Sequence, residues 1–221
     1  MDLIVRMLPL ALAIAFSSVP ILAALMILLS PNAKRSAVPF LIGFVAGMFA
    51  VVSLCTVFTQ LVPSARLPRR EDHIVGQFEI VVGIALVLLG LFALWRSRRS
   101  TEHSIPDWLK STEKLGPWSA FGLALLLNIR PKSLLIAVAA GLTLRADAQS
   151  VGEAIVALAV YTAIGASTVA IPIIAAASSP QRVQPRLVRG REWLVRNGEV
   201  VASIILLLIG VLVIGAGFER L

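Results

Sequence analysis

Apolar residues along the chain come in long blocks separated by short polar stretches. Six blocks stand out, at residues 7–29, 37–60, 74–95, 117–144, 151–177 and 198–218. They lack the alternation of apolar and polar positions that is typical of a half-solvated strand or helix. About 20 apolar residues in a helix cross the hydrocarbon layer of a membrane, and at this spacing only helices satisfy the backbone there. The pattern therefore predicts an all-α membrane protein with six transmembrane helices.

Composition supports the same class. Hydrophobic residues make up 58% of the 221 residues and charged residues 14%, against roughly 45–50% and about 25% in an ordinary soluble domain. Six spans with short connections leave no room for a separate soluble domain. We therefore expect a single integral membrane domain over residues 1–221.

The basic residues predict an orientation. Of the 20 Lys and Arg residues, 12 fall in the first, third and fifth connections, and 6 fall in the other two connections and the chain ends. Basic loops are held on the cytoplasmic side, so we expect both termini outside the plasma (inner) membrane. The net charge of +8 then suits membrane lipids and not nucleic acid. The basic stretch 181–197 is either an amphipathic segment on the inner leaflet or a solvated loop.

The sequence also matches itself at two places. Residues 77–90 align with residues 197–210, with glutamate opposite glutamate and glycine opposite glycine. Residues 17–22 align with residues 128–133, which puts one proline opposite another. Internal repeats of this kind are typical of transporter folds.

These matches predict two repeats of three helices each. A unit of three spans ends on the side opposite to where it began, so the second unit must be inverted relative to the first. We expect repeat 1 at residues 1–96, a basic cytoplasmic loop at 97–116, and repeat 2 at 117–221. The pseudo-two-fold axis then lies in the membrane plane.

The paired prolines, Pro20 and Pro131, predict helix breaks inside the first and fourth spans. Proline lacks an N–H group and disfavours helical geometry at the preceding residue. In carriers built from inverted repeats, such breaks face a cavity, and the half-helix N-termini receive anions. The alternative is a kink whose backbone is satisfied by a neighbouring helix.

Two cations flank the second break. A cation near the bilayer centre costs about 2.5–3.5 kcal/mol on insertion scales and indicates function by default. Together with nearby polar residues they form a predicted site for an anionic headgroup, sulfate, phosphate or carboxylate. Its members are Arg130, Lys132, Asn128, Ser133, Ser17 and Ser18. The alternative is a displaced span, with both cations extended to the cytoplasmic interface.

Two carboxylates and two glycines complete the candidate residues. Glu79 and Glu199 stand at the start of the third and sixth spans, where they either complement the helix dipole or act as paired gating or proton-coupling groups. Gly43 and Gly47 form a GxxxG pattern, which serves close packing within the monomer or, less favoured, a homodimer.

Other chemistries lack the residues that they need. Cys55 is the only cysteine, and His73 and His103 lie in polar stretches away from any cluster with metal-ligand spacing. We expect no metal and no cofactor. No nucleophile motif or catalytic constellation appears in the sequence, so we expect a protein that is not an enzyme.

Several stretches resemble one known family. They read PDWLK, AFGLALLLN, PKSLL and AAG, at residues 106–110, 120–128, 131–135 and 139–141. They are similar to the GAP family, the glycopeptidolipid- and sulfolipid-addressing proteins of mycobacteria and related actinobacteria, placed within the lysine-exporter (LysE) superfamily. Six spans in two opposed three-helix repeats also suit that superfamily.

The resemblance implies a non-enzymatic inner-membrane protein that helps to export an anionic cell-envelope lipid or glycolipid, alongside a larger lipid-transporter partner. The family's Pro-Lys step carries over to Pro131 and Lys132. Arg130 stands where many members have Asn, which adds a positive charge, and Asn128 lies two residues earlier. Two alternatives stay open: an exporter of small soluble metabolites such as amino acids, and a membrane scaffold whose basic loops recruit a partner.

Overall fold

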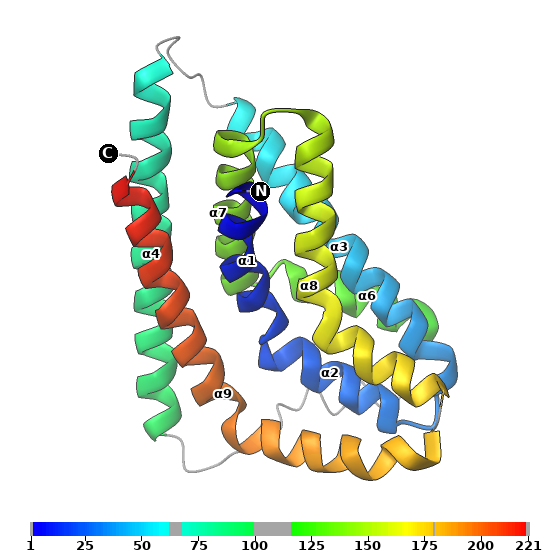
Figure 1. The fold of residues 1–221 in the computed structure, drawn as a ribbon. Coiled ribbons are helices and arrows are strands. Elements are labelled where there is room, and N and C mark those ends of the chain that lie inside the picture. The colour runs from blue at the N-terminus through cyan, green and yellow to red at the C-terminus, as the bar shows by residue number, and fades with distance from the viewer. Residues whose placement is uncertain (1, 62–67, 100–115, 179, 220–221) are drawn as a thin grey trace.

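The computed structural model describes residues 2–61, 68–99, 116–178 and 180–219, and in these ranges the regular structure is entirely helical. Most of the predicted basic loop 97–116 lies outside these ranges. The helices are α1 (Asp2–Ala15), α2 (Ser18–Leu29), α3 (Ala33–Leu61), α4 (Pro68–Arg99), α6 (Pro117–Asn128), α7 (Pro131–Asp147), α8 (Val151–Ser178) and α9 (Pro180–Glu219), as Figure 1 shows.

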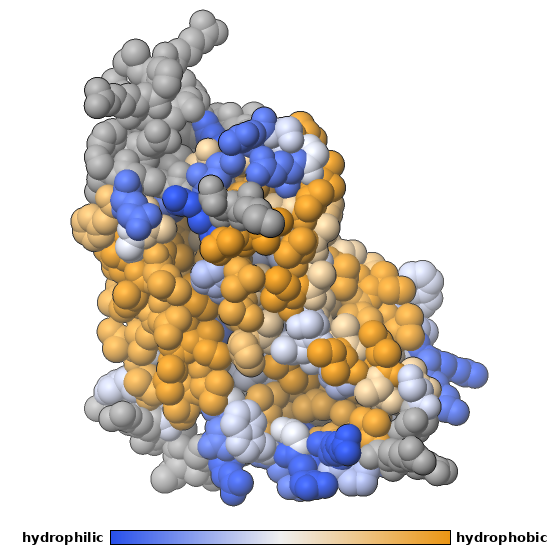
Figure 2. All heavy atoms as spheres, in the orientation of Figure 1, coloured by the Kyte–Doolittle hydropathy of each residue, from blue (hydrophilic) through white to orange (hydrophobic). Residues whose placement is uncertain are grey.

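Four to six apolar spans are present in the described part of the chain. Single helices supply four of them, in α3, α4, α8 and α9, and two bent helix pairs raise the number to six if each pair is one span. Figure 2 shows apolar side chains over the middle of the visible face and hydrophilic side chains toward its two ends. The chain is therefore a multi-pass membrane protein, as the blocks of apolar residues predict.

Both predicted helix breaks are confirmed. α1 and α2 meet at 51°, and α6 and α7 meet at 65°. Pro131 is the first residue of α7, where its missing N–H costs nothing. Pro20 lies in the first turn of α2, so that the break precedes it at residues 16–17. In both pairs the proline fits the start of the second helix and cannot continue the first.

Hydroxyl groups satisfy carbonyls that the breaks release. Thr168 on α8 donates its Oγ1–H to the Ala15 carbonyl at the end of α1. Ser133 on α7 donates its Oγ–H to the Leu127 carbonyl of α6, at 3.3 Å. A carbonyl without a partner is costly in an apolar environment, so these two hydroxyls stabilise the bent geometry.

Glycines bring α4 and α9 into close contact, and this is the most extensive helix pairing in the described structure. A Cβ atom built on Gly83 would lie 2.9 Å from the Gly210 carbonyl oxygen. One built on Gly217 would lie 2.7 Å from the Gly76 carbonyl oxygen. Small residues at such positions allow the two backbones to approach, as in many membrane helix pairs.

The GxxxG pattern packs within the monomer. Cβ atoms built on Gly43 and Gly47 would lie 2.6 Å from the Phe121 carbonyl oxygen and 2.7 Å from Asn128 Nδ2. Both neighbours belong to α6, so the glycine face of α3 is used for a contact inside the chain. A homodimer stays a prediction.

The start of α1 and the end of α9 lie on the same side of the molecule (Figure 1). The first part of α9 runs crosswise beneath the bundle at the opposite end, and the helix then turns upward beside α4. Residues 183–197 are helical throughout. The expectation of a solvated loop at 181–197 is therefore wrong, because a continuous helix occupies the stretch despite Pro185 and Gly190.

Candidate functional site

A pocket of about 250 Å³ lies between the two helix breaks and the α4–α9 pair. Its walls come from the start of α2, the last turns of α4, the α6–α7 break and the part of α9 that follows its crosswise segment. Eight of the ten predicted site and break residues line it: Ser17, Ser18, Pro20, Arg130, Pro131, Lys132, Ser133 and Glu199. We call it the cationic pocket.

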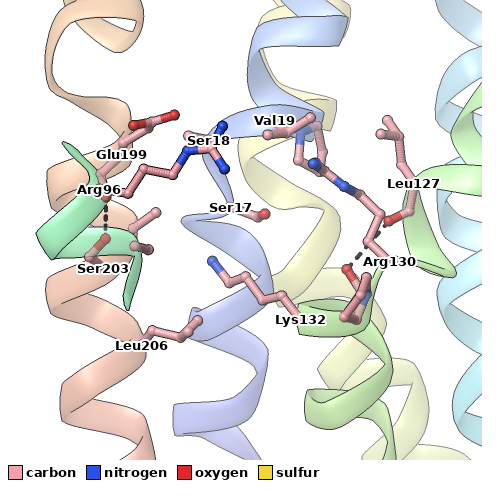
Figure 3. Close-up of a pocket in the computed structure, with 15 residues that line it drawn as sticks. Ser17, Ser18, Val19, Arg96, Leu127, Arg130, Lys132, Glu199, Ser203 and Leu206 are labelled. Atoms are coloured by element: carbon pink, nitrogen blue, oxygen red, sulfur yellow. Dashed lines mark hydrogen bonds between the residues drawn. The ribbon is translucent and has the colours of Figure 1, made fainter. Parts of the chain in front are cut away.

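Two predicted cations enter this pocket from one break. Arg130 lies in the α6–α7 connection as the N-cap residue of α7, and Lys132 is the second residue of that helix. In Figure 3 the Lys132 ammonium points into the hollow below Ser17, and the Arg130 guanidinium extends toward Val19 at the start of α2. Lys132 is half-buried and Arg130 is exposed. Although residues two apart point to different faces of a helix, the break lets both cations line one cavity.

Arg96 is a third cation in the wall, and sequence reasoning missed it as a site residue. It lies in the last turn of α4, just beyond the apolar block that ends at residue 95. In Figure 3 its side chain extends from α4 into the pocket that Ser18 and Glu199 also line. Nothing in the sequence separates Arg96 from its basic neighbours, because its place in the wall depends on how α4 packs against α9.

Two helix N-termini also face the pocket. Ser17 and Arg130 are the N-cap residues of α2 and α7, and neither side chain caps its helix with a hydrogen bond. The free N–H groups of the first turn give a helix N-terminus a partial positive charge. Both predicted half-helix N-termini therefore add to the positive character of the site.

Asn128 does not line the pocket. It is buried, and its Nδ2 donates hydrogen bonds to the Phe44 carbonyl of α3 at 3.3 Å and to the Ala124 carbonyl at 2.9 Å. Its role in the structure is to join α6 to α3. Because Asn128 is close to the break in sequence, we expect it in the pocket. In the structure, the last turn of α6 directs its amide toward α3 instead.

The two predicted gating carboxylates differ in setting. Glu199 lies in the pocket wall, and Ser203 on the next turn donates its Oγ–H to the Glu199 carbonyl at 2.6 Å. Glu79 is buried in α4 and does not line the pocket. Neither residue lies in the first turn of its helix, because α4 and α9 begin well before the apolar blocks. The expected helix-dipole role is therefore wrong for both.

The charges suit an anion. Among the described lining residues, Arg96, Arg130 and Lys132 are cationic and Glu199 is the one acid. Arg presents a planar fork of donors and Lys a point charge, and both bind sulfate, phosphate or carboxylate groups. Within the described ranges no cluster of three or more His, Cys, Asp or Glu residues has the geometry of a metal site.

A second hollow, of about 390 Å³, lies where the start of α1 meets the corner between α7 and α8. Arg6 and Asp147 line it, with 3.8 Å between Arg6 Nε and Asp147 Oδ2. In Figure 1 this corner lies at the end of the molecule opposite the crosswise part of α9. The two hollows therefore open at different depths of the bundle.

Comparison with known proteins identifies the family. Residues 7–219 match the family described as Sap, sulfolipid-1-addressing protein. No curated protein matches the chain, and no solved structure matches it. Because the match covers almost the whole chain, including both breaks and every residue of the cationic pocket, the protein belongs to the Sap, sulfolipid-1-addressing protein, family.

Proposed function

We propose that this protein assists the export of an anionic cell-envelope lipid or glycolipid and binds its headgroup in the cationic pocket. The family description names the addressing of a sulfolipid, and a sulfate ester is an anion that guanidinium and ammonium groups bind well. No catalytic step is needed for this role, so the protein acts as a transport protein and not as an enzyme.

One observation carries the proposal. Three cations and two uncapped helix N-termini converge on a hollow formed at the breaks of two bent, apolar helix pairs. Arg130 and Lys132 lie within the fourth apolar block, and charges within spans are expensive and are retained where they contact a substrate, an ion or a partner. The volume of about 250 Å³ is sufficient for the sulfate, phosphate or carboxylate group of a headgroup, and the acyl chains would lie outside it.

The helix pairing supports an inverted repeat. α1 packs on α8 as α6 packs on α3, and α2 packs on α9 as α7 packs on α4. If α1, α2, α3 and α4 are exchanged in order with α6, α7, α8 and α9, the same pairings result. We propose six spans in two inverted halves, with both termini outside and the basic connections in the cytoplasm, as the distribution of Lys and Arg predicts. The placement among lysine exporters stays a prediction.

A larger lipid transporter in the same membrane is the proposed partner. The pocket is too small to enclose a whole lipid, so the acyl chains need another surface during transfer. We propose that the Sap protein presents the headgroup and that the partner supplies the energy for transport.

Export of a small soluble anion is the second candidate function. The pocket volume of about 250 Å³ is close to the lower end of the range for small-molecule sites. The excess of positive charge in the wall favours a carboxylate, sulfate or phosphate compound over a cationic amino acid.

The test removes two of the pocket cations. The variant Arg130→Gln/Lys132→Gln should abolish delivery of the lipid to the cell surface at an unchanged protein level. Lys34→Gln/Arg35→Gln is the matched control, because it removes two exposed charges at the start of α3, outside the pocket. Quantitative lipid analysis of the cell surface is the measurement.

Each outcome separates one function from the others. Normal lipid delivery by the pocket variant would refute the headgroup site. Loss of efflux of a water-soluble anion, with normal lipid delivery, would support the second candidate. A scaffold would lose function on deletion of residues 180–196 and would keep it in the pocket variant.

A further inference from the structure

The crosswise part of α9, residues 183–197, has a basic outer face. We call it the basic surface segment. Arg186, Arg189 and Arg196 are exposed, and the Trp193 side chain between them is 50% exposed. Their spacing of three or four residues places them along one stripe of the helix. A stripe of arginines with a tryptophan is typical of a helix that lies in the plane of a membrane interface.

The opposite face of the segment is fixed to the bundle. Leu187 is buried, and a Cβ atom built on Gly190 would lie 4.0 Å from Leu25 Cδ1 of α2. At the end of the segment, a Cβ atom on Gly198 would lie 3.0 Å from Ser18 Cβ. The segment is therefore held crosswise by contact with α2, and its charged stripe stays exposed.

The position of the segment relates it to the membrane. In Figure 1 it lies at one end of the bundle, below the upright helices. In Figure 2 hydrophilic side chains at that end border the apolar middle of the molecule. A helix at this border lies at the depth of lipid headgroups, where each arginine is attracted by an anionic leaflet.

The segment is also continuous with the cationic pocket. Glu199, Ala202 and Ser203 of the pocket wall follow it directly in the same helix. Ser18, which Gly198 contacts, lines the pocket as well. Headgroups gathered along the stripe are therefore next to the wall of the pocket.

We propose that the basic surface segment is a docking surface for anionic lipid headgroups of the leaflet in which it lies, and that it concentrates them beside the cationic pocket. The segment has positive charge, an interfacial aromatic side chain and a fixed orientation, and these match an anionic lipid surface. The docking of headgroups on the segment does not depend on the proposed function. Only the later entry of a headgroup into the cationic pocket rests on it.

The test measures lipid enrichment around Trp193. The full chain carries Trp95→Phe, Trp108→Phe and Trp118→Phe, so that Trp193 is its only tryptophan. It is reconstituted into vesicles that contain either dansyl-phosphatidylglycerol or dansyl-phosphatidylcholine as the probe lipid. Energy transfer from Trp193 to the dansyl group reports which headgroup gathers at the segment.

The wild-type segment should show stronger transfer to the anionic probe, and added salt should reduce the preference. Each arginine near an anionic surface contributes about fivefold, so Arg186→Gln/Arg189→Gln should remove most of the preference. Lys34→Gln/Arg35→Gln, with the same change in charge, should retain it. A melting curve for each variant in detergent confirms that the fold is kept.

Three results would overturn the proposal: equal transfer to both probes in the wild type, an unchanged preference in Arg186→Gln/Arg189→Gln, or lost export by that variant with its lipid preference intact. The last result would assign the segment to a protein partner. A failure of the proposed headgroup site can be distinguished from a failure of this proposal. Arg130→Gln/Lys132→Gln alters the pocket and leaves the energy transfer from Trp193 in place.

Discussion

Glu199 offers a test in which a substitution should strengthen binding. It is the one acid among the described residues that line the cationic pocket, and it repels any anion held there. The change Glu199→Gln keeps the shape of the side chain and removes its charge. We therefore expect tighter binding of the headgroup, in contrast to the loss expected for any of the three cations.

The size of the pocket gives the magnitude. A sphere of the pocket's volume, about 250 Å³, has a radius of about 4 Å. Adding a contact radius of about 2 Å for the atoms of the wall places a centred anion about 6 Å from the carboxylate oxygen. Repulsion at that distance is about 0.7 kcal/mol at the dielectric constant of water and about 3 kcal/mol at an effective value of about 20. Glu199 is exposed, which places the effect near the lower value, at about 1 kcal/mol or roughly fivefold in Kd.

The assay is calorimetric titration of the detergent-solubilised full chain with a short-chain sulfated glycolipid, at low and at high salt. Glu219→Gln is the control, because Glu219 is exposed on the same helix, outside the pocket and the basic surface segment, and loses the same charge. Equal Kd values for the two variants, or weaker binding by Glu199→Gln, would show that Glu199 does not face the ligand and would refute the charge argument.

Two further predictions concern stability, measured as the midpoint of thermal unfolding in detergent. Gly83→Ala should destabilise the protein by about 1–3 kcal/mol because the new Cβ meets backbone of α9. Gly122→Ala is the control, because its Cβ meets nothing within 4 Å, and it should leave the midpoint unchanged or raise it. Equal effects of the two changes would contradict the close packing of α4 and α9. Thr168→Val should cost about 1–3 kcal/mol because the Ala15 carbonyl loses its donor. Thr162→Val removes a bond within its own helix and should cost less, so a larger loss there would count against the role of Thr168.

The spans and breaks followed from local properties of the sequence. Apolar blocks of the right length predicted the spans, and a proline within a block predicted a bend because its effect on the backbone is local. The cations next to Pro131 line the pocket, since the residues that flank a break line the space that it opens, and their contact with a headgroup stays a prediction.

The missed and misplaced residues depend on packing between distant helices. Arg96 joins the site because of how α4 packs against α9, and Asn128 leaves it because Phe44 of α3 supplies an acceptor. Glu79 and Glu199 were assigned to first turns because apolar blocks define spans, while the helices themselves begin earlier. A hydropathy pattern does not reveal the polar turns by which a helix extends beyond its apolar block.

The glycine contact between α4 and α9 has a consequence for the route of a lipid. Where Gly83 faces Gly210, the two main chains are so near each other that even one added carbon collides, and an acyl chain is wider than that. The seam between these two helices is thus shut to lipid tails. Under the proposed function, the tails of a lipid held by its headgroup therefore pass along another part of the bundle than the seam between α4 and α9.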